Sequence, residues 1–551
     1  MEATRVPHYR SAVNFARVEA SAYKPMHTAC FIAVALAVAR PVTAQQPQLS
    51  ARDSAFHALN RLAYGPRPGE VDSVARGGVM RWIERQLDPE QIPDRPLAER
   101  QRGFKILDYD RADLARRYRE AVRERERLQR EAAQAGDSTR LRAARPMREF
   151  RELAGELQQL AVVRATLSER QLREVMVDFW TNHFNVFAGK GADRFLLPSY
   201  IEETIRPRAL GRFEDLLIAT AESPAMLFYL DNARSVAPGS SPPGPLSAGR
   251  RGGTNGRSRP TGINENYARE LLELHTLGVD GGYTQQDVIE VARIFTGWSI
   301  EPPERGAGFV FRDWAHDYGD KRVLGVTFRG EGRTEGVKLL TLLASSHATM
   351  HHVSAKLCAR FVADEPPDGC VDAAVAAWDK SRGDIRAILR AIFTSPDFWS
   401  PQAVRTKVKT PLEFVVSAVR ATGADPDDSP RLAQVVARLG EPLYLQPAPT
   451  GYAENEAHWV NSGALLARMN AAVALAAGRL PGVTANLDHV IPTTRDDDQL
   501  VDLVNERVLG GTMSAHTKRV ILGQLTDMAD PMQARALAVG LALGGPDFQK
   551  Q

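Results

Sequence analysis

Apolar residues recur every three or four positions along most of the chain, and this spacing predicts α-helices. The segment 264–277 is typical, with an apolar face opposite a polar one. Its apolar positions are Tyr267, Ala268, Leu271, Leu272 and Leu274. Residues 309–328 differ, because FVF and VLGVTF on either side of a polar turn predict a β-hairpin. The pattern therefore indicates an all-α fold, a large multi-helix body with one small β-hairpin.

Two segments interrupt this pattern. Residues 108–160 are dense in interleaved positive and negative charges, which predicts an exposed helical hairpin held by charge pairs one turn apart. Residues 236–262 are rich in Pro, Gly and Ser and predict a flexible surface loop. The main helical domain is expected over 45–480, followed by a C-terminal helical tail over 481–551.

The N-terminus has the features of a targeting segment. An 11-residue apolar run at 29–39 is followed by the small-residue exit Val-Thr-Ala at 42–44, as in a secretory signal peptide. We expect residues 1–44 to be a signal peptide and the protein to be exported, periplasmic or extracellular. A buried N-terminal helix is the alternative, and the start codon stays open between Met1 and Met26. No apolar stretch reaches the roughly 18 residues that a membrane span needs.

The charge balance argues against nucleic acid as a partner. The chain of 551 residues has 70 Lys and Arg against 67 Asp and Glu. Residues 1–44 contain five basic and two acidic residues, so the rest of the chain has 65 of each and is formally neutral. Because a general nucleic-acid binder shows a strong basic bias, we expect no nucleic-acid partner.

Two cysteines remain after the predicted signal peptide. Cys358 and Cys370 flank a turn at 364–369. In an oxidising compartment they would form a disulfide across that turn, and the alternative is a pair of buried thiols. The two cysteines do not form a C-x-x-C pair, and the sequence contains no other such pair, so a structural zinc site is not expected.

The segment 173–187 mixes polar side chains with large aromatic ones. At 100° per residue, Asp178 and Asn182 fall on one side of the predicted helix, whereas Trp180 falls on the other. His183 lies on the apolar side. Its imidazole is therefore expected to point toward the core.

A second polar segment covers residues 264–298. His275 lies within the apolar face of its helix, while Arg269, Glu270 and Glu273 lie on the opposite face. The two glutamates are one turn apart, which suits paired acid–base chemistry or a metal site. A solvated charged face is the alternative.

Two histidines thus point inward from separate helices. Imidazole is suited to proton transfer near neutral pH. We hypothesise a pocket where both rings converge with carboxylates; in the alternative, each ring simply bonds a backbone carbonyl or an Asn in the core. The predicted catalytic residues are Asp178, His183, Arg269, Glu270, Glu273 and His275. The predicted substrate-binding residues are Trp180, Asn182, Trp298 and His316, and no metal or cofactor is assigned.

Several stretches carry a resemblance to a known family: LNRLAYGPRPGEV, FWTNHFNV, NENYARELLELHTLGVDGGYTQQDVIEVARIFTGW, KLCARFV and VKTPLEFVVSAVRATG. In order and spacing they resemble the domain of unknown function 1800 family, over about 55–475. The resemblance implies an exported, mostly helical bacterial protein, often encoded beside a secreted partner that looks sulfatase-like or phosphatase-like. It implies no established reaction.

The common nucleotide and hydrolase motifs are missing: the sequence has no P-loop, no dinucleotide glycine fingerprint, no G-x-S-x-G and no H-E-x-x-H. We expect a hydrolase that acts on a cell-surface or polymeric substrate through a buried His/Glu/Asp pocket. The rival hypothesis is a non-catalytic scaffold, or a maturation partner of a co-encoded secreted protein, in which the same polar groups fix the helix register.

Overall fold

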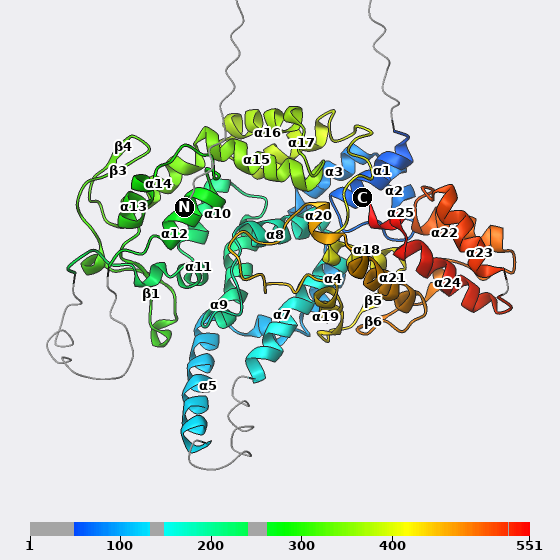
Figure 1. Cartoon of the computed structure of the whole chain (residues 1–551), viewed down its shortest axis with the longest axis horizontal. Helices are drawn as coiled ribbons and strands as arrows, with labels where there is room; N and C mark the ends of the chain where they lie inside the picture. Colours follow the sequence, from blue (N-terminus) through cyan, green and yellow to red (C-terminus); the bar gives the residue numbers. More distant parts are fainter. Residues whose placement is uncertain (1–48, 133–147, 241–261, 527) are drawn as a thin grey trace, which may run out of the picture. The chain divides into compact units, whose positions relative to one another are not determined.

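The computed structural model describes residues 49–132, 148–240, 262–526 and 528–551 (Figure 1). The predicted signal peptide and most of the predicted 236–262 loop lie outside the described residues. Residues 49–551 form one compact unit. Its described elements are almost all helices, so the predicted all-α class is confirmed.

The helices fall into three runs along the chain. The first run is α1 (Ala51–Arg61), α2 (Glu70–Gly77), α3 (Val79–Leu87), α4 (Arg95–Gln101), α5 (Arg111–Ala132), α7 (Arg148–Leu167), α8 (Gln171–His183) and α9 (Asp193–Ser199). The second is α10 (Phe213–Ala221), α11 (Pro224–Tyr229), α12 (Asn266–Glu270), the π-helical turn η8 (Leu271–His275), α13 (Gln285–Ile294), α14 (Arg333–Ala344), α15 (His347–Phe361), α16 (Asp368–Ser381) and α17 (Ile385–Thr394). The third is α18 (Pro411–Ala421), α19 (Arg431–Arg438), α20 (Glu456–Trp459), α21 (Ser462–Ala476), α22 (Asp497–Val508), α23 (Ala515–Leu525), α24 (Pro531–Gly544) and α25 (Pro546–Gln549).

The strands differ from the single predicted hairpin. The FVF segment, β2 (Phe309–Phe311), pairs with β1 (Trp298–Ile300), and β3 (Lys321–Val323) pairs with β4 (Val326–Phe328). A third short pair joins β5 (Asp425–Pro426) to β6 (Val483–Thr484).

The turn between β3 and β4 explains the correction. Leu324 and Gly325 both have positive φ, 50° and 80°, as in the two-residue turns that favour tight hairpins. The VLGV sequence thus closes a hairpin on itself. The FVF strand therefore pairs with β1, which precedes it in the chain.

The charged segment 108–160 contributes two helices, α5 and the first part of α7. Arg117 on α5 forms a salt bridge of 3.0 Å with Glu149 on α7. Tyr118 and Phe150 pack edge to face beneath it, with ring centroids 5.3 Å apart. The tip of the predicted hairpin, 133–147, lies outside the described residues.

The segment 481–551 packs against the rest of the compact unit. Helix α24 lies along α21. The last residues pair with the chain just before α18, because Lys409 N donates to Gln549 O at 2.9 Å and Gln551 N donates to Lys407 O at 2.8 Å. This pairing ties the C-terminal segment to the start of α18.

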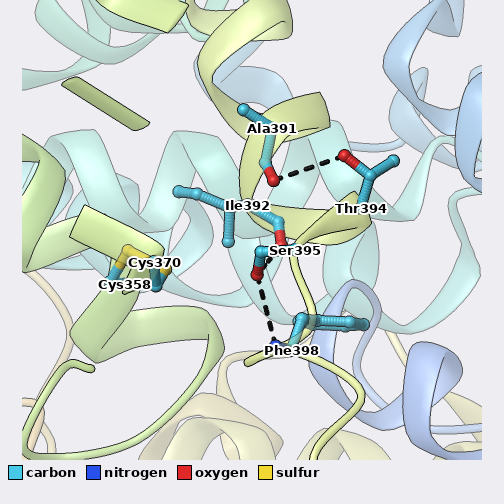
Figure 2. Close-up of a disulfide and its surroundings, with 7 residues drawn as sticks. All are labelled: Cys358, Cys370, Ala391, Ile392, Thr394, Ser395 and Phe398. Carbon is cyan, nitrogen blue, oxygen red and sulfur yellow. Dashed lines mark hydrogen bonds between the residues drawn. A yellow bond between two sulfur atoms is a disulfide. The ribbon is translucent and has the colours of Figure 1, made fainter. Parts of the chain in front are cut away.

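Cys358 on α15 and Cys370 on α16 form a disulfide, as the first of the two alternatives predicted. Both residues are fully buried. Figure 2 shows the disulfide near the end of α17, where the Ser395 hydroxyl accepts from Phe398 N. In the part of the chain that the structure describes, no helix is long and apolar enough to cross a membrane.

Candidate functional site

His183 and His275 do meet in the structure. Their ring centroids are 6.3 Å apart, and both residues are 2% exposed. His183 Nε2 donates to the backbone carbonyl of His275 at 3.2 Å. The prediction that both rings point inward therefore agrees with the geometry, but the contact between them runs through the main chain.

The surroundings of the two rings are apolar and cationic. Phe184 packs against both imidazoles, with centroid distances of 4.5 and 5.1 Å. Burial, followed by the nearby Lys356 ammonium, lowers the pKa of His275 to about 3. The same causes hold the pKa of His183 well below its usual range. Both rings are neutral at neutral pH and poorly suited to accept a proton.

The end of η8 explains why a histidine sits here. The last carbonyls of a helix lack partners within that helix. His183 supplies one N–H donor to His275 O, and His352 Nε2 supplies another to Leu274 O at 3.3 Å. Two imidazoles thus cap one helix end.

The predicted carboxylate partners lie elsewhere. Glu270 and Glu273 are partly exposed, and Glu273 accepts a 3.5 Å hydrogen bond from the Tyr283 hydroxyl. Arg269 pairs with Glu265 at 3.5 Å. These contacts are those of a solvated charged face, which was the alternative.

His316 belongs to a separate buried cluster. Its Nε2 lies against Glu335 Oε1, to which Lys321 Nζ also donates at 2.7 Å. Its Nδ1 donates to Thr296 O at 2.8 Å. Both ring nitrogens of His316 therefore face oxygen atoms. The cluster holds β3 against α14.

The two predicted tryptophans are core residues. Trp180 and Trp298 are both fully buried. Trp180 Nε1 donates to Ala209 O at 3.0 Å. The Trp298 ring lies on Gly336, where a Cβ would come within 2.5 Å of it. Neither indole is open to a ligand.

Asp178 and Asn182 lie on the other side of α8, in a small polar pocket that we call the carboxyl pocket. Its cavity is about 40 Å³, which holds a small number of water molecules but not a sugar or peptide unit. The lining residues are Asp178, Thr181, Asn182, Asn185, Arg360, Thr410, Glu441, Leu443, Tyr444, Tyr452, Ala453, Glu454 and Trp459.

Two carboxyls of this pocket hold protons to unusually high pH. Burial raises the pKa of Asp178 to about 7, against the opposing effect of Arg360. Burial, and then the Asp178 carboxyl, raises the pKa of Glu441 to about 8. By contrast Arg360 overcomes the effect of burial on the adjacent Glu413, whose pKa is lowered. The pocket thus has two carboxyls that titrate near neutrality next to one that stays ionised.

The start of α18 fixes these carboxyls. Thr410 and Glu413 form a capping box, in which Thr410 N donates to Glu413 Oε2 at 2.9 Å. Leu412 N donates to Glu441 Oε2 at 2.8 Å. Free N–H groups at a helix N-terminus favour carboxylates, so the helix end positions both glutamates.

Asn182 holds the loop that covers the pocket. Its amide donates to Tyr452 O at 2.9 Å and accepts from Tyr452 N at 2.7 Å. Asn185 donates to Gln446 O and Ala448 O at 3.0 and 2.8 Å. The two amides together anchor the loop 440–458 to α8.

Comparison with protein families places the chain. The profile of the family described as "Protein of unknown function (DUF1800)" matches residues 57–550. The chain belongs to the DUF1800 family. The match runs past residue 480, where the main helical domain was expected to end. No curated protein and no solved structure matches the chain.

The described residues of this DUF1800 chain include no cluster of three or more His, Cys, Asp or Glu that could hold a metal ion. Sequence reasoning missed Arg360, Glu413 and Glu441. The T-P-L-E capping signal at 410–413 was available, since it begins α18. Nothing local marks Glu441, which reaches the pocket from the loop after α19.

Proposed function

We propose that this protein is an exported hydrolase that uses Asp178 and Glu441 of the carboxyl pocket as its acid–base pair. The single observation that carries the proposal is the pair of raised pKa values, about 7 and about 8, in one pocket. Two carboxyls whose pKa values are both raised toward neutrality are suited to take and give protons near pH 7.

The chemistry follows from the two titrations. Between the two values the pair holds about one proton, and we assign the proton to Glu441, whose pKa is the higher. Asp178 would take a proton from an attacking water, and Glu441 would give one to the leaving group. Because the groups interact, the two values belong to the pair as a unit.

The size of the pocket limits the substrate. A cavity of about 40 Å³ admits water but no substrate unit. The bond to be broken would therefore lie across the mouth, near Tyr452 and Trp459, whose ring centroids are 5.8 Å apart. This arrangement suits a surface or polymeric substrate that passes over the mouth.

Export is supported by two features. The apolar run at 29–39 with its Val-Thr-Ala exit has the pattern of a signal peptide. The Cys358–Cys370 disulfide fits an oxidising compartment. We place the mature protein in the periplasm or outside the cell.

The test is hydrolysis of purified envelope polymers, followed by the release of new end groups. We expect Asp178→Asn and Glu441→Gln each to lower the rate by about 100-fold or more. Glu273→Gln and His275→Phe are the matched controls and should leave the rate unchanged. Full activity in both pocket variants would contradict the assignment, and failure to hydrolyse any envelope polymer would contradict the reaction class.

A second candidate is a scaffold, or a maturation partner of a secreted sulfatase-like or phosphatase-like protein. The observation that favours it is that the side-chain amides of Asn182 and Asn185 form hydrogen bonds with the backbone of the 440–458 loop. In that case the buried polar groups specify the fold. Pull-down from the native envelope fraction would yield one stoichiometric protein partner, retained by Asp178→Asn.

A further inference from the structure

A second cavity, distinct from the carboxyl pocket, lies along α7. We call it the α7 cavity, and its volume is about 700 Å³, within the range of small-molecule sites. Helices α7 and α9 and the loop after α19 form its walls. Neither the sequence motifs nor the proposed hydrolysis uses it.

The walls of the α7 cavity are mostly apolar. The apolar side chains that shape it include Phe150, Leu153, Leu157, Leu197, Tyr444 and Leu445. Phe150, Leu153, Leu157 and Leu197 are buried. Leu445 is 39% exposed. Apolar walls of this kind favour a hydrocarbon group over water.

Three arginines also line the α7 cavity: Arg148, Arg151 and Arg194. Arg148 is paired with Glu152 at 2.7 Å. Arg151 and Arg194 form no side-chain hydrogen bond or salt bridge with any other residue that the structure describes. Guanidinium groups suit carboxylate and phosphate, to which they donate in pairs. The cavity thus combines apolar walls with two arginines, from different helices, that have no side-chain partner among the described residues.

We infer that the α7 cavity binds an anionic amphiphile, with its alkyl chain along the apolar walls and its carboxylate or phosphate at Arg151 and Arg194. A neutral lipid would leave both guanidinium groups without a partner. A small anion would leave the apolar walls bare. The inference does not depend on the proposed hydrolysis. Tyr444 lines both the α7 cavity and the carboxyl pocket.

The test is equilibrium binding to the purified mature chain, below the micelle concentration of each probe. The probes are hexadecanoate, hexadecyl phosphate, hexadecanol and inorganic phosphate. We expect saturable binding of the two anionic amphiphiles, about tenfold weaker binding of the alcohol, and no binding of phosphate. The stronger of the two anionic probes identifies a carboxylate or a phosphate headgroup.

Variants separate the charge from the hydrocarbon contact. Arg151→Gln with Arg194→Gln should weaken the anionic probes about tenfold and leave the alcohol unchanged. Ala154→Trp, which fills the cavity, should abolish the binding of all three long-chain probes. Arg76→Gln, on the exposed side of α2, is the matched control and should change nothing.

Three results would overturn the inference: no saturable binding of any amphiphile, equal affinity for acid and alcohol, or wild-type binding in the double arginine variant. Thermal unfolding of each variant verifies that it is folded. Hydrolysis by Asp178→Asn and binding of hexadecanoate are measured separately, so either proposal can fail alone.

Discussion

At the scale of single residues, burial affects the carboxyl groups of this protein in opposite ways. Glu413 is 4% exposed, yet Arg360 and the Thr410 N–H keep it ionised. Asp193 is fully buried, and neither of its oxygens has a hydrogen-bond partner among the described residues. Burial raises the pKa of Asp193 to about 9, against the opposing effect of Lys190. The partner, rather than the depth, decides the protonation state.

Asp193→Asn should therefore stabilise the protein at alkaline pH. The unfolded carboxyl has its ordinary pKa of 3.8, so between about pH 4 and 9 the native state binds more protons than the unfolded state. The free energy of unfolding of the wild type then falls by roughly 1.4 kcal/mol per pH unit from this group alone. Urea unfolding from pH 5 to 9 measures the slope.

The variant should show a flatter slope and a higher free energy of unfolding at pH 8. Asp372→Asn, on the exposed side of α16, is the control and should keep the wild-type slope. Identical slopes in wild type and Asp193→Asn would show that Asp193 is ionised in the native state.

The residue scale also shows how far a sequence can predict this site. Helical periodicity correctly predicted that the side chains of His183 and His275 point inward, because the direction of a side chain on a helix depends on local spacing. It could not show that Lys356, far along the chain, would lie near both rings. The identity of a neighbour depends on tertiary packing, and burial together with that neighbour keeps both rings neutral.

At the scale of elements, the 440–458 loop depends on one close approach. Gly451 has a φ of 71°, and a Cβ there would lie 2.4 Å from Asn182 O and 2.5 Å from Asn182 Oδ1. Gly440 has a φ of 111°, and a Cβ there would have no atom within 4 Å. Both glycines have a positive φ that would strain any other residue, and they differ in the contact that a Cβ would make.

Gly451→Ala should displace the loop, whereas Gly440→Ala should cost only backbone strain. We expect a loss of about 1–3 kcal/mol in Gly440→Ala and clearly more in Gly451→Ala. The measurements are urea unfolding and proteolysis within the loop. Equal losses in the two variants would mean that contact with Asn182 does not hold the loop.

The disulfide joins α15 to α16 over a sequence separation of 12. Closing so short a loop in the unfolded chain is worth about 2–3 kcal/mol. Cys358→Ala with Cys370→Ala should lower the free energy of unfolding by that amount. The wild type should lose the same amount on addition of reductant, while the double variant should not respond. A reductant-insensitive wild type would contradict the pairing.

The strand pairs show which prediction from the local hydrophobic pattern was wrong at this scale. FVF and VLGVTF were each identified as one extended strand; FVF is one, but VLGVTF contains the turn at Leu324 and Gly325 and is divided between β3 and β4. The partner was wrong, since Leu324-Gly325 already closes β3 on β4. A register that depends on backbone twist at one dipeptide is poorly encoded in hydrophobic alternation.

At the scale of the whole molecule, the fold class was predictable and the carboxyl pocket was not. Helical spacing is local, so an all-α unit followed from sequence alone. The pocket draws Asp178 from α8, Arg360 from α15 and Glu441 from the loop after α19. These residues are separated by more than a hundred positions or by several helices, and only packing brings them together.

The most direct test of the account is an infrared titration of the protonated carboxyls in an Asp193→Asn background, which removes the buried carboxyl whose pKa is raised to about 9. The account predicts two carboxyls that ionise between about pH 6 and 9, with apparent pKa values near 7 and 8. Asp178→Asn and Glu441→Gln should each leave one such step. Complete ionisation by pH 5 would contradict it.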